Sequence, residues 1–326
     1  MTKYARLRRP EHCNALSASR PYFEGWYFRH TSADGAFSFA VIPGMHRSRD
    51  GEDHSFIQCI CAPGPVDYFR PYPAAAFYCR DNPFSVVVGE SEFGLSGIRL
   101  RTGSGKEEIS ADIAYGSPRP PAPRSVMGPF SWLPLECNHG VLSLSHSLRG
   151  SVRLGGKSIS MDGGTGYIEK DWGSSFPAGW VWLQGNTPVS ARLPASFTCS
   201  IAQVPIWKGS LTGLIAILAV GRREYRFATY NAGRVTWLEY GPGTLDIKLA
   251  RGRLRLSAFA RTGSFSPLRA PTPAGMDRLI EESLDSAISV RLECGKGLLY
   301  AGEFRGAGIE LVNTPLLKTA HSRRGS

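Results

Sequence analysis

The stretch 286–294 reads SAISVRLEC, and from Ile288 onward an apolar or cysteine side chain occupies every second position. The same alternation recurs in RGRLRLSAFAR at 251–261 and in 141–154. Successive side chains of a strand point to opposite faces, so a period of two is typical of half-buried strands. The sequence therefore predicts an all-β protein.

A chain of 326 residues is long enough for two domains or for one large β architecture. Its 37 glycines and 23 prolines predict many tight turns, and its 42% apolar and 20% charged residues exclude a disordered or fibrous protein. We predict two antiparallel barrels or sandwiches in tandem, 1–187 and 188–326, divided at the proline cluster 188–194. Only 273–285 has a helical pattern, so we expect at most one or two short helices.

The net charge of +11 lies mostly in the chain ends, with +4 in residues 1–20 and +3 in 317–326. A nucleic-acid groove would instead gather cations on a folded face between aromatic side chains, so we expect no nucleic-acid partner. The basic ends predict weak association with anionic membrane surfaces. Residues 1–15 and 317–326 have little apolar periodicity, and we expect both segments to be dispensable for folding.

The seven cysteines are scattered, and the sequence shows no second pair at zinc-finger spacing beside Cys59 and Cys61. We expect buried, reduced cysteines in a cytoplasmic protein that is peripheral at the membrane at most. His139 and His146 are seven residues apart in strand-like sequence, which is poor geometry for metal ligands. No metal site and no cofactor are expected.

Two segments combine acids with aromatic residues: PYFEGWYFR at 21–29, and GYIEKDWG at 166–173 followed by WVWLQ at 180–184. We predict that they form adjacent strands. By strand parity three groups each share a face: Glu24, Trp26 and Phe28; Tyr167, Glu169 and Asp171; Trp180, Trp182 and Gln184.

These acids have either a structural or a chemical interpretation. Aromatic strands are mostly core, and a carboxylate among them can pair with Lys170 or hydrogen-bond a turn. Acids are, however, almost never buried without a partner, and an apolar surround raises the pKa of a carboxyl group. Such a group donates a proton near neutral pH, and tryptophan faces stabilise the positive charge that follows.

At these segments the chain resembles the tocopherol cyclase family. The resemblance is carried by PYFEGWYF, by GYIEKDWGSSFPAGWVWLQGN and by LRAPT at 268–272, with GPFSW at 128–132 and ECNHG at 136–140 similar to the bacterial branch. It spans about residues 20–312. It implies paired lipocalin-like β-barrel domains and no cofactor or metal. It also implies protonation of a prenyl double bond followed by closure of a chroman ring on a phenol oxygen.

The resemblance implies roles for individual residues of this chain. Glu24 and Asp171, with Glu169 behind them, are the candidate acids, although Asp171 stands where the plant enzymes have an asparagine. The remaining candidates contact a prenylated phenol or other isoprenoid substrate: Trp26, Tyr27, Tyr167, Lys170, Trp172, Trp180, Trp182 and Gln184.

Among the acids we favour Glu24, because aromatic side chains surround it in sequence. A pairing with Arg29 would instead make it structural. An isomerase-type cyclase is the leading prediction for the whole chain. The alternatives are an isoprenoid hydratase, which admits water to the same cation, and a non-catalytic isoprenoid or lipid carrier.

Overall fold

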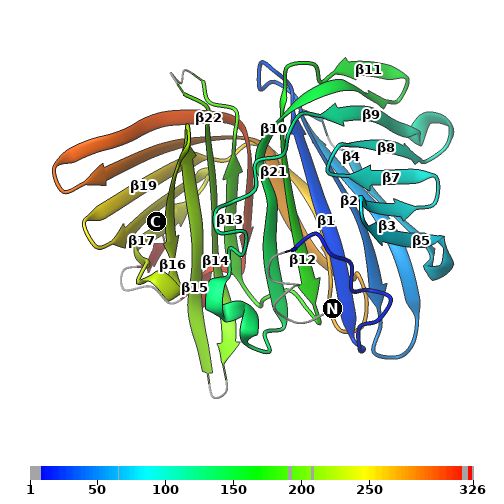
Figure 1. The fold of residues 1–326 in the computed structure, drawn as a ribbon, viewed down its shortest axis with the longest axis horizontal. Coiled ribbons are helices and arrows are strands. Elements are labelled where there is room, and N and C mark those ends of the chain that lie inside the picture. Colours follow the sequence, from blue (N-terminus) through cyan, green and yellow to red (C-terminus); the bar gives the residue numbers. More distant parts are fainter. Residues whose placement is uncertain (1–8, 65, 190–192, 207–208, 318–321, 325–326) are drawn as a thin grey trace. The chain divides into compact units, whose positions relative to one another are not determined.

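A computed structural model describes residues 9–64, 66–189, 193–206, 209–317 and 322–324. The regular structure of these residues is almost entirely strand, arranged in two mostly antiparallel sheets (Figure 1). The predicted all-β, two-sheet fold class is confirmed. Short 3-10 helices join some of the strands: η1 Ala74–Ala76, η2 Gly105–Glu107, η3 Gly128–Trp132, η4 Thr229–Asn231 and η5 Thr314–Leu316.

The first sheet is built around the pair β1 and β12, which carry the two acid-containing motifs. In spatial order its strands are β4 Val66–Pro73, β3 Asp53–Ala62, β2 Ser38–Arg47, β1 Tyr22–Thr31, β12 Thr165–Gly173, β10 Cys137–Leu154, β9 Ile109–Tyr115, β8 Gly97–Thr102, β7 Ser91–Gly94, β6 Phe84–Val88 and β5 Phe77–Asp81. β11 Lys157–Ser160 pairs with β10 outside this order.

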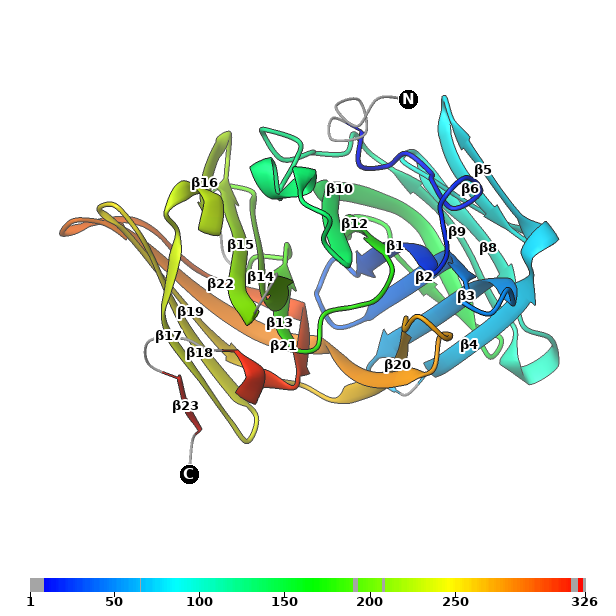
Figure 2. The same ribbon diagram turned by 90° about the horizontal axis from the view of Figure 1, so that it is seen from below.

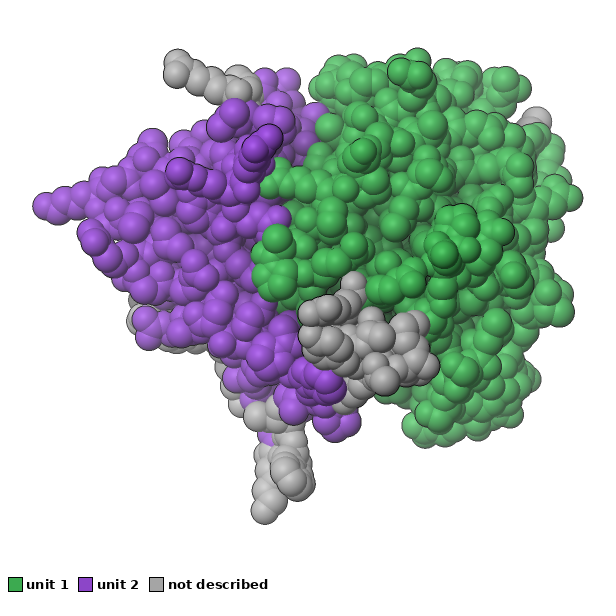
Figure 3. Space-filling model, in the orientation of Figure 1, with its two compact units in different colours: residues 1–126, 136–176, 267–280 green, residues 127–135, 177–266, 281–326 purple. Residues whose placement is uncertain are grey.

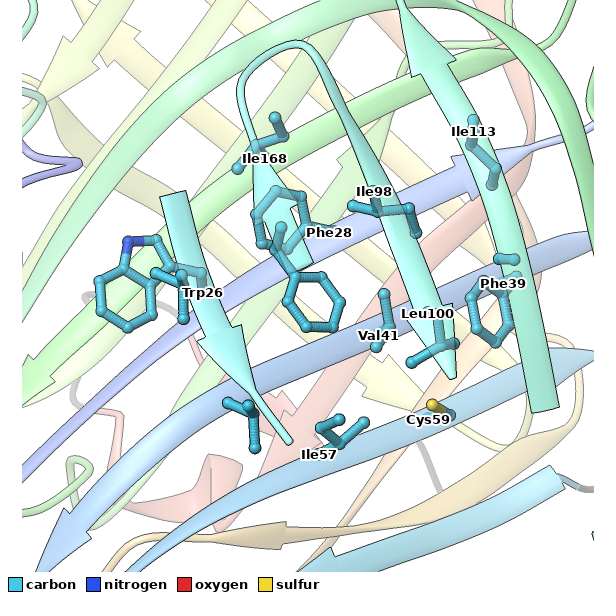
Figure 4. Close-up of a cluster of buried hydrophobic side chains, with 14 of the residues drawn as sticks. Trp26, Phe28, Phe39, Val41, Ile57, Cys59, Ile98, Leu100, Ile113 and Ile168 are labelled. Atoms are coloured by element: carbon cyan, nitrogen blue, oxygen red, sulfur yellow. The ribbon is translucent and has the colours of Figure 1, made fainter. Parts of the chain in front are cut away.

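One face of the first sheet encloses a continuous apolar core. Phe28 and Val41, from β1 and β2, belong to the same buried cluster as Ile98 and Ile113, from β8 and β9. Their side chains lie together in Figure 4. Because strands from both halves of the order contribute to one cluster, the sheet folds over onto its own apolar face.

The second sheet has its own core, to which Val181 and Leu183 belong. Its strands follow the order β16 Arg223–Ala228, β15 Gly209–Val220, β14 Ala195–Ile206, β13 Trp180–Gly185, β22 Gly297–Val312, β21 Arg278–Cys294, β19 Leu254–Arg261, β18 Thr244–Arg251, β17 Arg234–Gly241 and β23 Ser322–Arg324, with β20 Phe265–Ala270 paired to β21.

The chain divides into two compact units, coloured separately in Figure 3. Unit 1 comprises 1–126, 136–176 and 267–280, and unit 2 comprises 127–135, 177–266 and 281–326. The segment 267–280 is fixed to unit 1 by the Gln58 side chain, which bonds both the N–H and the carbonyl oxygen of Arg269. The domain limits that we predicted, 1–187 and 188–326, treated each domain as one continuous segment.

β13 is not adjacent to β1 and β12, so this part of the predicted strand arrangement is wrong. β1 and β12 are neighbours, as expected, but β13 pairs with β14 and β22 in the second sheet. The apolar residues Val181 and Leu183 explain the difference, because they fill the core of unit 2. The strand 180–184, which we placed in the domain 1–187, therefore belongs to the second unit.

The helical interpretation of 273–285 is also wrong. From Arg278 onward the chain is part of the long strand β21 (Figure 2). Ile280, Glu282 and Leu284 are all buried, which is the period-two pattern of a strand. The pairing of Glu282 and Ser283 with β22 outweighs the local helical spacing.

The cysteine prediction needs one correction, because Cys13 and Cys79 form a disulfide with their Cα atoms 6.4 Å apart. Cys59, Cys61 and Cys199 are buried free thiols, as expected. Cys13 lies in the segment 1–15 that we expected to be dispensable, and Leu317, in the other such segment, is buried in the core of unit 2. Ala15 is fully buried in the core of unit 1, so residues 9–15 are part of the fold.

The basic residues Lys3, Arg6, Arg8 and Lys318 lie outside the described residues. The association of these residues with membranes stays a prediction. Its test needs a shorter deletion, because residues 9–15 are part of the fold. Vesicle binding should be compared after removal of 1–8 rather than 1–15. Within the described part of the chain, no helix is long and apolar enough to cross a membrane.

A buried polar cluster in unit 1 predicts a pH-dependent stability. The Tyr115 hydroxyl lies 2.6 Å from His30 Nε2, and His146 Nδ1 lies 2.9 Å from Ser143 Oγ. Burial lowers the pKa of His30 and of His146 to about 3, and repulsion between the two rings contributes at His30. A Cβ atom at Gly166 would stand 2.2 Å from His146 Nε2, so this nitrogen packs directly on the strand.

We expect the free energy of unfolding to fall as the pH drops from 6.5 toward 3, the ordinary and folded pKa values of these histidines. In that range the unfolded chain binds protons that the folded one does not, and each histidine contributes at most about 5 kcal/mol. Urea unfolding at several pH values measures this slope. His146→Asn, which keeps a hydrogen-bonding side chain but does not titrate, should make the slope shallower. Parallel slopes for the two proteins would contradict the assignment.

Candidate active site

The two motif strands present different side chains on their two faces. The register pairs Glu24 with Trp172 and Trp26 with Lys170 on the face that carries the core of unit 1. Tyr167, Glu169 and Asp171 lie on the opposite face. The strand parity expected from the sequence is therefore correct, and the candidate acids are divided between the two faces.

On the core face, Glu24 forms a buried ion pair with Lys170. The Lys170 Nζ atom lies 2.5 Å from Glu24 Oε1, and both side chains are almost completely buried. The backbone N–H groups of Asn14 and Ala15 donate to Glu24 Oε2 at 2.9 and 2.7 Å. Every one of these groups facing Glu24 is a hydrogen-bond donor, so they match the ionised carboxylate.

Lys170 is enclosed as completely as its partner. Its Nζ atom lies 4.8 Å from the ring centre of Trp26 and 4.9 Å from that of Trp172, and it donates to the carbonyl oxygen of His12. Burial lowers the pKa of Lys170, and the negative charge of Glu24 opposes this shift. The two indole rings predicted to contact substrate thus contact an ammonium group of the protein itself.

These contacts favour the structural interpretation of Glu24, with Lys170 rather than Arg29 as its partner. Arg29 lies on the opposite face of β1, where it pairs in register with Tyr167. The ion pair and the disulfide of Cys13 together hold the segment before β1 against the sheet. Glu24 as the proton donor stays a prediction, but the geometry favours another acid.

On the opposite face, Tyr167, Glu169 and Asp171 of β12 and His139 of β10 form a polar chain. The Tyr167 hydroxyl donates to Glu169 Oε2 at 2.6 Å, and His139 Nε2 lies 3.8 Å from the same oxygen. His139 Nδ1 lies 2.9 Å from Asp171 Oδ1. Tyr167 and Glu169 are buried, with exposed fractions of 1% and 5%, although neither belongs to the core cluster of unit 1.

This arrangement can store and transfer a proton. If Asp171 accepts the hydrogen bond from Nδ1–H of a neutral His139, the lone pair of Nε2 faces Glu169. An aspartate that orients a histidine toward a third group is a recurring arrangement in acid–base catalysis. Glu169 thus accepts a hydrogen bond from a tyrosine hydroxyl and has an imidazole nitrogen 3.8 Å away, which would need to move closer to exchange a proton with it.

His139, Glu169 and Asp171 are also the group of described residues that could hold a metal ion. The two carboxylates, however, approach different nitrogens of the imidazole ring, Nδ1 for Asp171 and Nε2 for Glu169. The 2.9 Å contact between His139 Nδ1 and Asp171 Oδ1 engages one ring nitrogen with a carboxylate of the protein itself. We therefore regard the three side chains as a polar chain.

Cys137, at the start of β10, lies near the same acids but does not act as a nucleophile. Burial raises the pKa of its thiol well above the ordinary value, and the negative charges of Asp171 and Glu136 add to this. The thiol therefore stays protonated, and a protonated thiol is a poor nucleophile.

Unit 2 carries the remaining candidates on β13. Trp180, Trp182 and Gln184 share the face opposite Val181 and Leu183, as parity predicts, and all three are buried. Trp180 Nε1–H donates to Glu310 Oε2 at 2.5 Å. This aromatic face is thus lined by a carboxylate that the sequence patterns did not single out.

The tocopherol cyclase-like family model matches residues 104–311. The chain belongs to this family. The matched range includes His139, β12 and β13, and it ends before Val312. Glu24 and Trp26 lie outside it. The family resemblance inferred from the motifs is therefore confirmed, and the matched range includes the polar chain on β10 and β12.

Solved structures show the same fold at low sequence identity. The crystal structure of CghA with Sch210972 gives a TM-score of 0.61 at 12% identity, covering 90% of this chain and 89% of that one. Kievitone hydratase from Nectria haematococca gives 0.55 at 12% identity, covering 94% and 91%. No curated protein matches the sequence significantly.

Of the four members of this polar chain, the sequence motifs predicted Tyr167, Glu169 and Asp171 as site residues but not His139. The spacing between His139 and His146 gives no indication of its partner, because that partner lies on the neighbouring strand. The register pairs His139 directly with Asp171. The signal available in the sequence was the motif ECNHG itself, which placed a histidine in a segment similar to the bacterial branch.

Proposed function

We propose that this member of the family is a cofactor-independent cyclase that closes a chroman-type ring on a prenylated phenol. The proposal is supported chiefly by the chain of Tyr167, Glu169, His139 and Asp171, which gives a buried carboxyl group two proton-exchanging neighbours. Family membership agrees with it, because it indicates a tocopherol cyclase-like protein. Glu169 is the proposed proton donor.

In the proposed reaction the Glu169 carboxyl group transfers its proton to the less substituted carbon of a prenyl double bond. The electron pair of the double bond forms the new C–H bond, which leaves a tertiary cation at the other carbon. The phenol oxygen then bonds to that carbon and loses its proton to the Glu169 carboxylate. The acid is restored, and the product is an isomer of the substrate.

The neighbours of Glu169 have separate roles in this scheme. His139, oriented by Asp171, exchanges a proton with Glu169 between turnovers. Tyr167 holds the carboxyl group through its hydroxyl. No step consumes an oxidant, a reductant or water, so no redox cofactor is required.

The tryptophans of unit 2 are the proposed isoprenoid contacts. Trp180 and Trp182 present two indole rings on one face of β13, with Gln184 beside them as a polar group. Indole faces attract positive charge and pack well against branched hydrocarbon. Trp26 and Trp172 are assigned instead to the enclosure of Lys170.

Incubation of the protein with a prenylated hydroquinone, followed by mass spectrometry and chromatography, tests the proposal. We expect a product with unchanged mass and a new retention time, because ring closure is an isomerisation. A mass gain of one water would indicate a hydratase, which uses the same cation but admits water. A ligand that is retained but returned unchanged would indicate a carrier, and either result would contradict the cyclase assignment.

A further inference from the structure

The chain before β1 is attached to the first sheet at two places. Described residues 9–20, which we call the N-terminal strap, belong to no strand or helix. One attachment is covalent, the disulfide between Cys13 of the strap and Cys79 of β5. β5 is the last strand at one edge of the described sheet, where it pairs with β6. The disulfide therefore joins an edge strand to a segment outside the sheet.

The second attachment is the buried ion pair at the centre of the sheet. The N–H groups of Asn14 and Ala15 donate to the Glu24 carboxylate. The Lys170 ammonium group donates to the carbonyl oxygen of His12. The strap thus supplies hydrogen bonds that replace water around both buried charges. A buried charge without such partners is costly, so the closed strap and the dry ion pair depend on each other.

The non-covalent contacts beside the disulfide come mainly from Asp81, the last residue of β5. One of its carboxylate oxygens lies 2.5 Å from His12 Nδ1, and the other accepts from the Cys13 N–H at 3.4 Å. Its carbonyl oxygen accepts from the Arg9 guanidinium group at 2.7 Å. The side chains of Asp81 and Arg9 are both exposed in part, so water competes for these contacts. The covalent bond is therefore the firm attachment at this end of the strap.

We propose that Cys13 and Cys79 form a thiol–disulfide exchange site, and that their reduction by a dithiol releases the strap and lets water reach the Glu24–Lys170 pair. Both cysteine residues are partly exposed, which gives a thiolate of the reductant access to a sulfur atom. In the open state water takes the place of the hydrogen bonds that the strap supplied. The strap thus has two arrangements, one closed and dry and one open and hydrated.

The exchange transfers two electrons from the dithiol to the protein. A thiolate of the reductant attacks one sulfur atom, the Cys13–Cys79 bond breaks, and the other sulfur leaves as a thiolate that takes up a proton. The second thiol of the reductant then displaces the remaining cysteine from the mixed disulfide. The reductant ends as a disulfide and both cysteines end as thiols. Oxidised glutathione, a small disulfide, reverses the reaction.

Release of the strap should also affect the polar chain on the other face of β12. Lys170 stands between Glu169 and Asp171 in this strand, and its contacts with Glu24 and His12 hold the strand from the core face. This consequence rests on the proposed function. We expect the reduced protein to close the ring more slowly by about tenfold or more, because a misplacement of about 1 Å can cost about 10²-fold.

Acetylation of lysine side chains tests the release without turnover. The full-length protein is kept oxidised with glutathione disulfide or reduced with dithiothreitol, treated briefly with acetic anhydride, and digested for mass spectrometry. Lys170 is completely buried and should react faster in the reduced protein by about tenfold or more. Lys157, an exposed residue of β11, should react equally in both forms. Hydrogen exchange at the Asn14 and Ala15 amides should rise together with the reactivity of Lys170.

Two variants assign the effect to this disulfide. The double variant Cys13→Ser, Cys79→Ser should expose Lys170 whether or not dithiothreitol is present. Cys294→Ser changes a partly buried free thiol of unit 2 and should respond to the reductant as the unmodified protein does. If the double variant fails to fold, the comparison of oxidised and reduced unmodified protein decides the question, together with the return of protection after oxidation.

Equal protection of Lys170 in the oxidised and reduced proteins would overturn the proposal, because the strap would then stay closed without the covalent bond. Free thiols at Cys13 and Cys79 after oxidation would also overturn it. So would loss of amide protection throughout β1, β2 and β3 on reduction, since the disulfide would then stabilise the whole unit. Exposure of Lys170 with unchanged ring closure would keep the strap and reject its effect on the polar chain. Ring closure by neither form would reject the cyclase and leave the strap assignment standing.

Discussion

Glu169→Gln should bind a prenylated phenol normally and lose turnover by about 10²–10⁴-fold, the usual contribution of general-acid catalysis. The glutamine carbonyl still accepts the hydrogen bond from Tyr167, so the strand and its packing should be preserved. The amide has no proton to donate at neutral pH. Single-turnover ring closure with saturating protein measures the loss, and equilibrium binding of the substrate checks the fold.

Two further variants serve as comparisons for Glu169→Gln, one at the partner of His139 and one as a control. Asp171→Ala should also lower kcat, because it removes the carboxylate that contacts His139 Nδ1 and orients the imidazole ring. Glu90→Gln makes the same chemical change at an exposed turn residue and should behave as the unmodified protein. Full turnover by Glu169→Gln would exclude Glu169 as the donor and return that role to Glu24 or Asp171.

Glu24→Gln and Lys170→Met should each lower the free energy of unfolding by about 3–5 kcal/mol, because each leaves an unpaired buried charge. The loss should be visible in urea unfolding at pH 7. The double variant should be more stable than either single one, since neither buried position then carries a charge. Glu239→Gln, on a half-buried position of β17, serves as the control for loss of a carboxylate.

The same experiment separates the two interpretations of Glu24. A structural ion pair predicts reduced stability together with retained turnover per folded molecule, measured well below the melting temperature. If Glu24→Gln were as stable as the unmodified protein and inactive, Glu24 would be the acid that the sequence first suggested. Additive losses in the double variant would show that the pair is not coupled.

Local alternation in the sequence was sufficient to predict the all-β class and the faces of the motif strands. Trp26 and Glu24 share the core face, and Glu169 and Asp171 share the other, because side-chain direction depends only on position along one strand. The all-β class and the family followed from the same short motifs. These features need no information about which strands are neighbours.

Features that depend on pairing between distant segments were not predictable in this way. Lys170 lies next to Glu24 in space but 146 residues away in the chain, and the register of β1 and β12 is what brings them together. The position of β13 in the second sheet and the strand at Arg278–Cys294 have the same cause. In each case the outcome depends on which strands pair with each other, and short-range sequence patterns do not contain this information.

Ring closure in D2O measures the transfer of a proton to the double bond most directly. If Glu169 delivers a solvent-derived proton, the product should carry one non-exchangeable deuterium, bound to the former alkene CH carbon, and mass spectrometry with NMR would locate it. Glu169→Gln should form this labelled product slower by about 10²–10⁴-fold. A cyclised product without deuterium at that carbon would contradict acid-catalysed cyclisation.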